Sequence, residues 1–372
     1  MRILFWISFF MIVYTYFGYP LLLILLSQKK GEKGTDYLLA PLEPNVSLVI
    51  PVHNEEKIIG DKIQNTLSLD YPKEKLEIIV VSDGSTDRTE EIVRRYEEEG
   101  VKFFKQPARK GKAGALNRGL QEAKNDVVVF SDASIFFEED ALRNIVRKFS
   151  ESRIGCVSGE DYIPGGSGEG AYGKYELFLR NLESRMGSIV GASGCFYAQR
   201  RSLCEPFPGG MAPDFFSVLK TVEKGYRAVT DPTAKGVMRS VPEPKTEFER
   251  KVRTLLRGMT TLLHFKHLMN PYRYGIFAIQ LISHKLIRWS VGIFLILLLL
   301  SNVFVLSSKM YASFFLLQIA FYVLAVIGWM GFSGPFFFRI PLFFSMVNSS
   351  ALWAWVKYFK GVRQEIWEPS RR

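Results

Sequence analysis

The sequence has few cysteines and histidines, three and four in 372 residues. The cysteines form no C-x-x-C pair, and an odd, sparse set argues against both a disulfide framework and a cysteine-based zinc site. Such usage is typical of a reducing compartment, where thiols stay free. No repeat, low-complexity tract or nucleic-acid-binding motif is present. We therefore expect buried, free thiols and no nucleic-acid partner, although the formal net charge is +11.

Charged residues are absent from residues 3–26, a stretch long enough to cross the ~30 Å hydrocarbon core of a bilayer. The run is too long for the apolar part of a signal peptide, and no small-x-small cleavage site follows it. Three lysines come next, at Lys29, Lys30 and Lys33. Because loops rich in Lys and Arg stay in the cytoplasm, we expect residues 1–27 to form a transmembrane helix with its N-terminus outside. Residues 28–44 read as a polar linker.

The C-terminal third is also rich in apolar residues. Residues 261–290 read as an amphipathic interface region, with Lys285 and Arg288 expected at the lipid headgroups. Residues 291–356 hold apolar membrane segments, and two of them, 291–305 and 311–330, are long enough to be predicted as spans. Ten Lys or Arg and three Glu lie between positions 239 and 288. Their place beside membrane segments favours lipid headgroups or a bound pyrophosphate over DNA.

A third apolar segment, residues 336–355, is interrupted by Pro341 and Asn348. A full crossing would leave the basic tail, residues 357–372, outside, against the positive-inside rule. We therefore expect this segment not to span fully and the C-terminus to be cytoplasmic.

The middle of the chain, residues 45–260, has the pattern of an α/β domain. Apolar runs at 46–50, 76–81, 101–104 and 126–130 predict strands, the first ending at Pro51, and 61–69, 88–100 and 113–123 predict helices. This alternation predicts a mixed, largely parallel sheet between helices. Ligands of such sheets bind at the carboxyl ends of the strands.

Acidic residues follow several of these segments. Asp83 and Asp132 each end a predicted strand, and Asp214 lies in an Ala-Pro-Asp-Phe-Phe segment. Between the first two lies a glycine-bearing loop with Lys110 and Lys112, just before a helix whose free N–H groups favour an anion such as a diphosphate. The loop lacks the P-loop pattern. A helix cap for each Asp, and a solvated basic loop for the lysines, are the plainer alternatives.

Five ordered motifs give these residues a family context. They are Pro51-Val-His-Asn-Glu55, Val81-Ser-Asp-Gly-Ser-Thr-Asp87, Lys110-Gly-Lys-Ala-Gly-Ala-Leu-Asn117, Ser131-Asp-Ala-Ser134 and Pro213-Asp-Phe215. Together they resemble the family 2 glycosyltransferases, which have a GT-A fold. With the flanking apolar segments, the chain is similar to the integral-membrane members that build polysaccharides or glycosylate lipids.

The resemblance implies a role for each matched position. Glu55 and Asp83 would hold the uracil and ribose of a UDP-sugar, Lys112 would approach the diphosphate, and Asp214 would be the catalytic base. Asp132, with Ser134, would bind Mg²⁺ or Mn²⁺. The remaining candidates for the nucleotide-sugar site are Pro51, Lys110, Asn117 and Arg253.

The sequence departs from the family pattern in three places. Ser134 replaces the second Asp of D-x-D, and Pro213 replaces the acidic residue before the base. Arg250-Lys-Val-Arg-Thr254 keeps only Arg253 of the Q-x-x-R-W motif of processive synthases, which weakens the expectation of processive polymerisation.

These observations predict a multi-pass protein of the cell membrane with a cytoplasmic catalytic domain. It would transfer a sugar from a nucleotide-sugar donor to a polysaccharide or lipid-linked acceptor, with inversion. The alternative is a non-catalytic membrane scaffold that keeps a nucleotide-binding fold. Release of UDP from a UDP-sugar would discriminate between the two.

Overall fold

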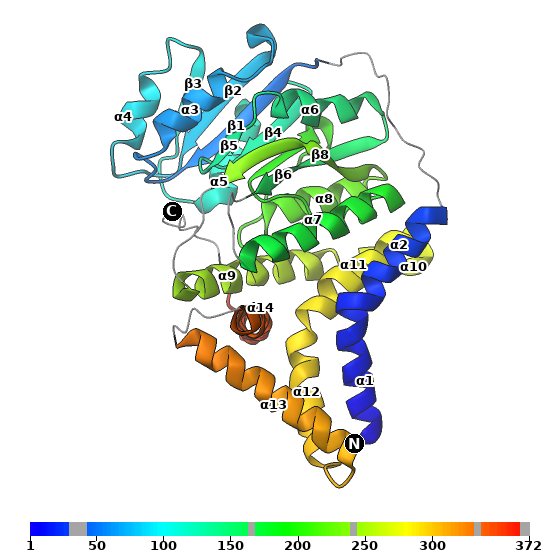
Figure 1. Cartoon of the computed structure of the whole chain (residues 1–372). Coiled ribbons are helices and arrows are strands. Elements are labelled where there is room, and N and C mark those ends of the chain that lie inside the picture. The colour runs from blue at the N-terminus through cyan, green and yellow to red at the C-terminus, as the bar shows by residue number, and fades with distance from the viewer. Residues whose placement is uncertain (30–42, 163–167, 239–243, 331–335, 365–372) are drawn as a thin grey trace.

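The computed structural model describes residues 1–29, 43–162, 168–238, 244–330 and 336–364 (Figure 1). Most of the expected linker at 28–44 and half of the basic tail at 357–372 lie outside the described residues. A central α/β domain lies at one end of the molecule, and long apolar helices extend from it (Figure 1).

The central domain is built on an eight-stranded sheet of order β3-β2-β1-β4-β7-β6-β8-β5. The strands are β1 Val46–Val52, β2 Leu76–Ser82, β3 Val101–Lys105, β4 Val127–Ser131, β5 Ile135–Phe137, β6 Ile154–Tyr162, β7 Phe196–Arg200 and β8 Arg227–Met238. β1 to β4 are parallel, whereas β7 is antiparallel to β4 and β6. The predicted mixed, largely parallel sheet is therefore confirmed.

Pro51 does not end the first strand, contrary to the prediction. β1 continues to Val52, and Pro51 pairs with Val81 of β2. Pairing with β4 ends at Val49, so at Pro51 the strand is paired only with β2. Proline is tolerated there because its missing backbone N–H is not needed for a bond to β4.

Helices cover both faces of the sheet. They are α3 Ile59–Leu67, α4 Thr89–Arg94, α5 Gly111–Glu122, α6 Ala141–Arg147, α7 Gly168–Met186 and α8 Pro213–Glu223. Alternate residues of β1 belong to different apolar clusters, Leu48 and Ile50 to one and Val49 to the other. Because both faces are buried, the sequences of the parallel strands are continuous apolar runs rather than alternating apolar and polar residues.

Two helices in the described part of the chain are long and apolar enough to cross a membrane. One is Arg2–Gln28, made of α1 (Arg2–Val13), a π-helical turn and α2 (Tyr19–Lys29), and the other is α13 (Lys309–Trp329). A third candidate span is bent. It consists of Ile276–Ile287, which includes α11 (Ile276–Leu281), and Val291–Val303, which is α12, and the two segments meet at 59°. It counts as a span only if the two segments cross the membrane together.

Two further helices lie between the central domain and these apolar helices. α9 (Pro244–His264) runs under the domain, and α14 (Phe336–Phe359) packs against it, seen end-on in Figure 1. α14 is not among the candidate spans. Beyond α14, Arg363 packs on the central domain, since a Cβ added to Gly210 would lie 3.6 Å from its Cβ.

A buried ionic network joins the apolar helices to the domain. Glu183 of α7 accepts hydrogen bonds from Tyr19 of α2 at 2.5 Å and pairs with His284 at 2.6 Å. The other ring nitrogen of His284 lies 3.2 Å from Glu176, which also pairs with Arg288. Arg288 is 8% exposed, so the expectation that it reaches the lipid headgroups is wrong: a protein carboxylate binds it instead.

Candidate active site

The loops after β1 and β2 are tied together by side-chain hydrogen bonds. Asn54 has a positive φ of 54°, and its Oδ1 accepts from the backbone N–H of Thr86 at 2.8 Å. The backbone N–H of Glu55 donates to the hydroxyl of Thr89 at 2.8 Å. The predicted site residue Glu55 is thereby fixed beside the loop that carries Asp83.

Asp83 is fully buried and holds the lysine-bearing loop. Its two carboxylate oxygens accept from the backbone N–H groups of Lys110 at 2.7 Å and Gly111 at 2.8 Å. Gly111 has a φ of 73°, which glycine adopts without strain. His53 Nδ1 lies 2.9 Å from the Asp83 carbonyl oxygen. This loop-holding role of Asp83 was not foreseen from the sequence.

Lys112 and Asp132 form an ion pair at the centre of the site. Lys112 Nζ also donates to the Gly194 carbonyl at 2.9 Å, and the Asp132 N–H donates to the Cys195 carbonyl at 3.1 Å. Burial opposes the charge of Lys112, but the Asp132 carboxylate offsets this and raises the pKa of the ammonium group. Lys112 therefore stays cationic near neutral pH, as a diphosphate ligand must. Lys110, by contrast, is exposed.

Asp214 lies in the first turn of α8, directly after Pro213 at the helix start. A Cβ added to Gly194 would be 3.8 Å from its carboxyl carbon, so Asp214 borders the carbonyl that Lys112 binds. Burial raises the pKa of Asp214, and the positive charges of Lys112, Lys285 and Arg257 reduce that rise. A carboxylate with a raised pKa among cations is suited to accept a proton.

Three cations around these carboxylates were not predicted from the sequence as part of the site. Arg257 is 8% exposed, donates to the Met211 carbonyl at 3.2 Å and interacts electrostatically with Asp214 and Asp132. Lys285, expected at the headgroups, instead influences Asp214. Lys62 is fully buried and donates to the Ile135 carbonyl at 2.7 Å.

Burial and the Asp132 charge act on Lys62 as they do on Lys112, but their balance gives the opposite shift in pKa. Burial lowers the pKa of Lys62 to about 7, against the opposing effect of Asp132. Only Arg257 had a sequence signal, because it follows Arg253 at the i, i+4 spacing that puts two residues on one helix face.

The other predicted positions lie outside this cluster of charges. The Asn117 amide donates to the Phe207 carbonyl at 3.0 Å and accepts from the Phe207 N–H at 2.7 Å, so it holds a loop. Pro51 is part of β1. Arg253 is half-buried on α9, one turn before Arg257. Contacts of these residues with a nucleotide stay predictions.

The described residues contain no group of three or more His, Cys, Asp or Glu side chains that could hold a metal ion by themselves. Asp132 offers one carboxylate, 20% exposed, and Ser134 a hydroxyl two residues on. Mg²⁺ is commonly bound through one or two carboxylates, with substrate phosphates and water supplying the other oxygens. The site therefore fits a hard cation that arrives with a diphosphate.

Residues 47–206 match the family model Glycosyl transferase family 2. The match lies within the central domain and covers less than half of the chain, so this domain is similar to the family 2 glycosyltransferases.

Two curated relatives match parts of the chain. YdaM of Bacillus subtilis (strain 168), named a probable glycosyltransferase, is 40% identical over 123 residues, 32% of this chain and 29% of that protein. The poly-beta-1,6-N-acetyl-D-glucosamine synthase of Staphylococcus epidermidis is 29% identical over 191 residues, 49% of this chain and 43% of that protein. The chain thus spans less than half the length of each.

One solved structure is similar over nearly the whole chain. It is a mannosyltransferase from Pyrobaculum calidifontis in complex with GDP-Man and Mn²⁺, with a TM-score of 0.71 and 24% identity, covering 96% of this chain and 99% of that one. At this identity the likeness establishes the fold, including the arrangement of a GT-A-like domain with long apolar helices.

Proposed function

We propose that this protein is a membrane glycosyltransferase that moves a sugar from a nucleotide-sugar donor to an acceptor hydroxyl. The single observation that carries the proposal is the cluster of Lys112, Asp132 and Asp214 beside the carboxyl ends of parallel strands. This is where α/β sheets bind their ligands. The match of the central domain to this family model supports the same activity.

In this proposal the donor is held by its diphosphate and its nucleoside. Lys110, Lys112 and Arg253 offer positive charge to the diphosphate, and Glu55 lies at the nucleoside end. Asp83 is buried and contributes by holding the backbone of the lysine loop rather than by direct contact. A Mg²⁺ or Mn²⁺ ion held by Asp132 and Ser134 would neutralise charge that develops on the leaving diphosphate. The sequence resemblance suggests UDP, but the similar mannosyltransferase binds GDP-Man, so both nucleotides need testing.

Asp214 is the proposed general base. As the acceptor oxygen bonds to the anomeric carbon, the bond from that carbon to the diphosphate breaks and Asp214 takes the hydroxyl proton. A single displacement inverts the anomeric centre. Lys112 stays positively charged while negative charge grows on the leaving group, which is where fixed cations contribute most.

The clustering of charges favours catalysis over the scaffold alternative. Burying Asp214 and its neighbouring cations costs free energy that a purely structural core avoids with apolar residues. Perturbed carboxylates beside cations in such a position are typical of functional sites. A scaffold would also have no use for a base with a raised pKa.

We further propose a multi-pass protein of the cell membrane with the central domain in the cytoplasm, where nucleotide sugars are found. The lysines after the first apolar segment favour this orientation. The contact of Arg363 with the central domain supports a C-terminal tail on the same side.

The test is a screen of UDP-sugars and GDP-sugars with the full-length protein purified in detergent. Release of the nucleoside diphosphate is measured for wild type and for Asp214→Asn. Release by wild type that depends on the acceptor and is lost in the variant supports the proposal. Donor binding without any turnover, across all donors and lipid extracts, would favour the scaffold.

A further inference from the structure

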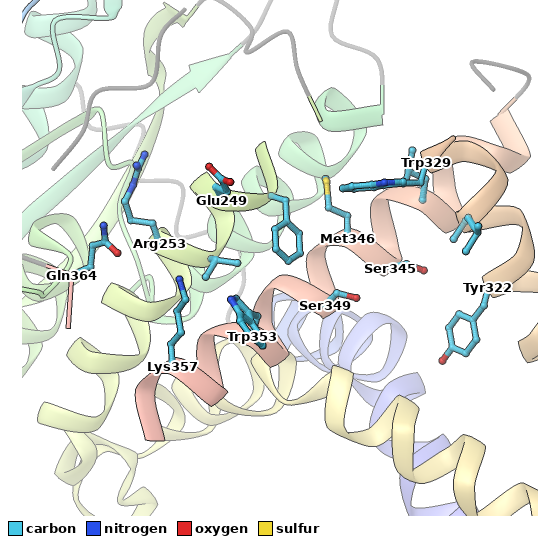
Figure 2. A pocket seen from close by; sticks show the side chains of 15 residues that line it. Glu249, Arg253, Tyr322, Trp329, Ser345, Met346, Ser349, Trp353, Lys357 and Gln364 are labelled. Carbon is cyan, nitrogen blue, oxygen red and sulfur yellow. The ribbon is translucent and has the colours of Figure 1, made fainter. Parts of the chain in front are cut away.

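Basic side chains reach the region beneath the central domain from two directions. Arg253 of α9 and Lys357 of α14 line a cavity of about 900 Å³ between α9, α13 and α14, and both lie at the same end of it (Figure 2). A π-helical turn, Ile282–Ile287, precedes α12 and carries Lys285. Lys285 is not among the residues that line the described cavity, and its charge acts on Asp214 instead.

The ammonium group of Lys285 lies in a niche beside Asp214. Its Nζ is 5.5 Å from the ring centroid of Phe215, the residue after Asp214, and 5.8 Å from that of Trp289. Aromatic rings within about 6 Å attract a cation. A Cβ added to Gly191 would lie 3.1 Å from the same Nζ, so the glycine leaves room for the ammonium group.

Lys285 has no ion-pair or hydrogen-bond partner of its own among the described residues. Its charged neighbours lie on α7 and on its own segment, and they are Glu176, Glu183, Arg180 and Arg288. Both carboxylates are already bound, Glu183 by His284 and Glu176 by Arg288. The charge of Lys285 is therefore directed at Asp214 rather than neutralised by a carboxylate in direct contact.

The residues before Lys285 fix the π-helical turn to two other segments. His284 Nδ1 lies 2.6 Å from Glu183 Oε1 on α7, and Ser283 Oγ lies 2.7 Å from the hydroxyl of Tyr14. Tyr14 begins a second π-helical turn, Tyr14–Gly18, in the first apolar helix. Such turns are rare and are frequently found at functional sites. Here the turn lets His284 face α7 while Lys285 faces Phe215 of α8.

Several elements present titratable or charged groups to Asp214. They are Lys112 of α5, Arg257 of α9, Lys285, Tyr197 of β7 and Cys156 of β6. Burial raises the pKa of the Tyr197 hydroxyl and of the Cys156 thiol, so both stay neutral. Lys112 already pairs with Asp132 and is proposed to bind the diphosphate. Lys285 has neither task, so its charge still acts on Asp214 when the donor is bound.

We infer that Lys285 is a positioning residue of the active site, whose ammonium group the two π-helical turns direct at Asp214 so that it stabilises the carboxylate form of that base. The inference rests on the proposed function, because Lys285 acts through its base. It also makes Tyr14 of the first apolar helix part of the catalytic apparatus. A lysine that served only the fold would leave the pH dependence of transfer unchanged.

The pH profile of kcat/KM for nucleoside diphosphate release tests the role of Lys285 in the full-length protein. In Lys285→Met the acid limb should move to higher pH, so that kcat/KM falls at least about tenfold below the limb, the effect of one pKa unit, and recovers at high pH. Lys285→Gln should do the same, and Lys285→Arg should keep most of the wild-type profile. Lys266→Met is the control, because Lys266 is an exposed lysine of the same region.

The fold of each variant is checked by thermal melting and by its affinity for the donor nucleotide, which should stay close to wild type. Loss of activity by the same factor at every pH in both uncharged variants would overturn the inference. An acid limb that stays in place would overturn it as well.

The link to the first apolar helix is tested with Tyr14→Phe, which removes the hydrogen bond to Ser283. The acid limb should move in the same direction by a smaller factor, about two- to fivefold, the equivalent of one hydrogen bond. Tyr311→Phe is the control, since its hydroxyl accepts from Trp6 of the same helix at 3.2 Å, away from Lys285. In the double variant Tyr14→Phe with Lys285→Met, the shift should not exceed that of Lys285→Met alone, whereas additive shifts would overturn the link.

Asp214→Asn separates this inference from the proposed function. A wild-type protein that turns over no donor, or Asp214→Asn with wild-type turnover, would contradict the proposed function. An acid limb that is unmoved in Lys285→Met, while Asp214→Asn has lost transfer, would contradict only the role of Lys285.

Discussion

Arg257 offers a sharp test of how the protein sets the basicity of Asp214. Burial raises the pKa of Asp214, and Arg257 is one of three cations that counter it. Replacing Arg257 by Gln removes a positive charge that favours the carboxylate, so the pKa of Asp214 rises further. The base works only when deprotonated, and the acid limb of kcat/KM must therefore move to higher pH.

The size of the shift follows from the order of the electrostatic effects. An opposite charge within about 4–6 Å changes a carboxyl pKa by about 1–3 units. Lys112 and Lys285 both affect Asp214 more than Arg257 does, so we expect about 1 unit, at the low end. One unit corresponds to a change of about 1.4 kcal/mol in the free-energy difference between the protonated and deprotonated forms of Asp214.

The measurement is the pH profile of nucleoside diphosphate release at limiting acceptor. Arg257→Lys should restore the wild-type profile in large part, because the charge returns. Arg273→Gln is the control, an exposed arginine on α10 (Pro271–Tyr274) that should leave the profile unchanged. An acid limb that stays in place or moves to lower pH in Arg257→Gln, with the fold intact by thermal melting, would refute the electrostatic reasoning.

Three further predictions concern the base, the metal and the topology. Asp214→Asn should lower the transfer rate about 10²–10⁴-fold, the usual effect of losing a general base, and leave nucleotide affinity nearly unchanged in a fluorescence titration; wild-type turnover would disprove the assignment. Transfer should stop in EDTA and return with Mg²⁺ or Mn²⁺, and Asp132→Ala should show the same loss even with the metal present, whereas full activity in chelator would mean that lysines and arginines alone neutralise the diphosphate. In a background without the native cysteines, Ser152→Cys and Ser370→Cys should both resist a membrane-impermeant thiol reagent in intact cells; labelling of position 370 would put the tail outside, and labelling of position 152 would contradict the cytoplasmic domain.

The parallel half of the sheet could be predicted because its strands are short apolar runs separated by turn residues. The strands at β1 to β4 and the helix at α5 agree with the prediction to within a few residues. The helix expected at 88–100 is α4 over Thr89–Arg94 only, followed by turns. Glu97, Glu98 and Glu99 crowd like charges there, which weakens the helix end.

The antiparallel strands and much of the site could not be predicted, because they depend on contacts between distant parts of the chain. β6, β7 and β8 pair across gaps in sequence that leave no local pattern. Asp83, Lys112, Asp132 and Asp214 carried motif signals. Lys62 and Lys285 did not, since a single lysine in a helix has the same sequence pattern whether it faces solvent, a lipid headgroup or a buried carboxylate.

The ionic network under α7 has a consequence for how the protein can be handled. Leu179, Leu182 and Met186 pack on Tyr19 and Leu23 of the first apolar helix, and Glu183 is 1% exposed beneath Tyr19. A fragment beginning at residue 43 would expose these apolar side chains to water and remove a hydrogen-bond donor from a buried carboxylate. The central domain and the first apolar helix therefore form one folding unit, and a truncation without that helix should aggregate unless the exposed surface is redesigned.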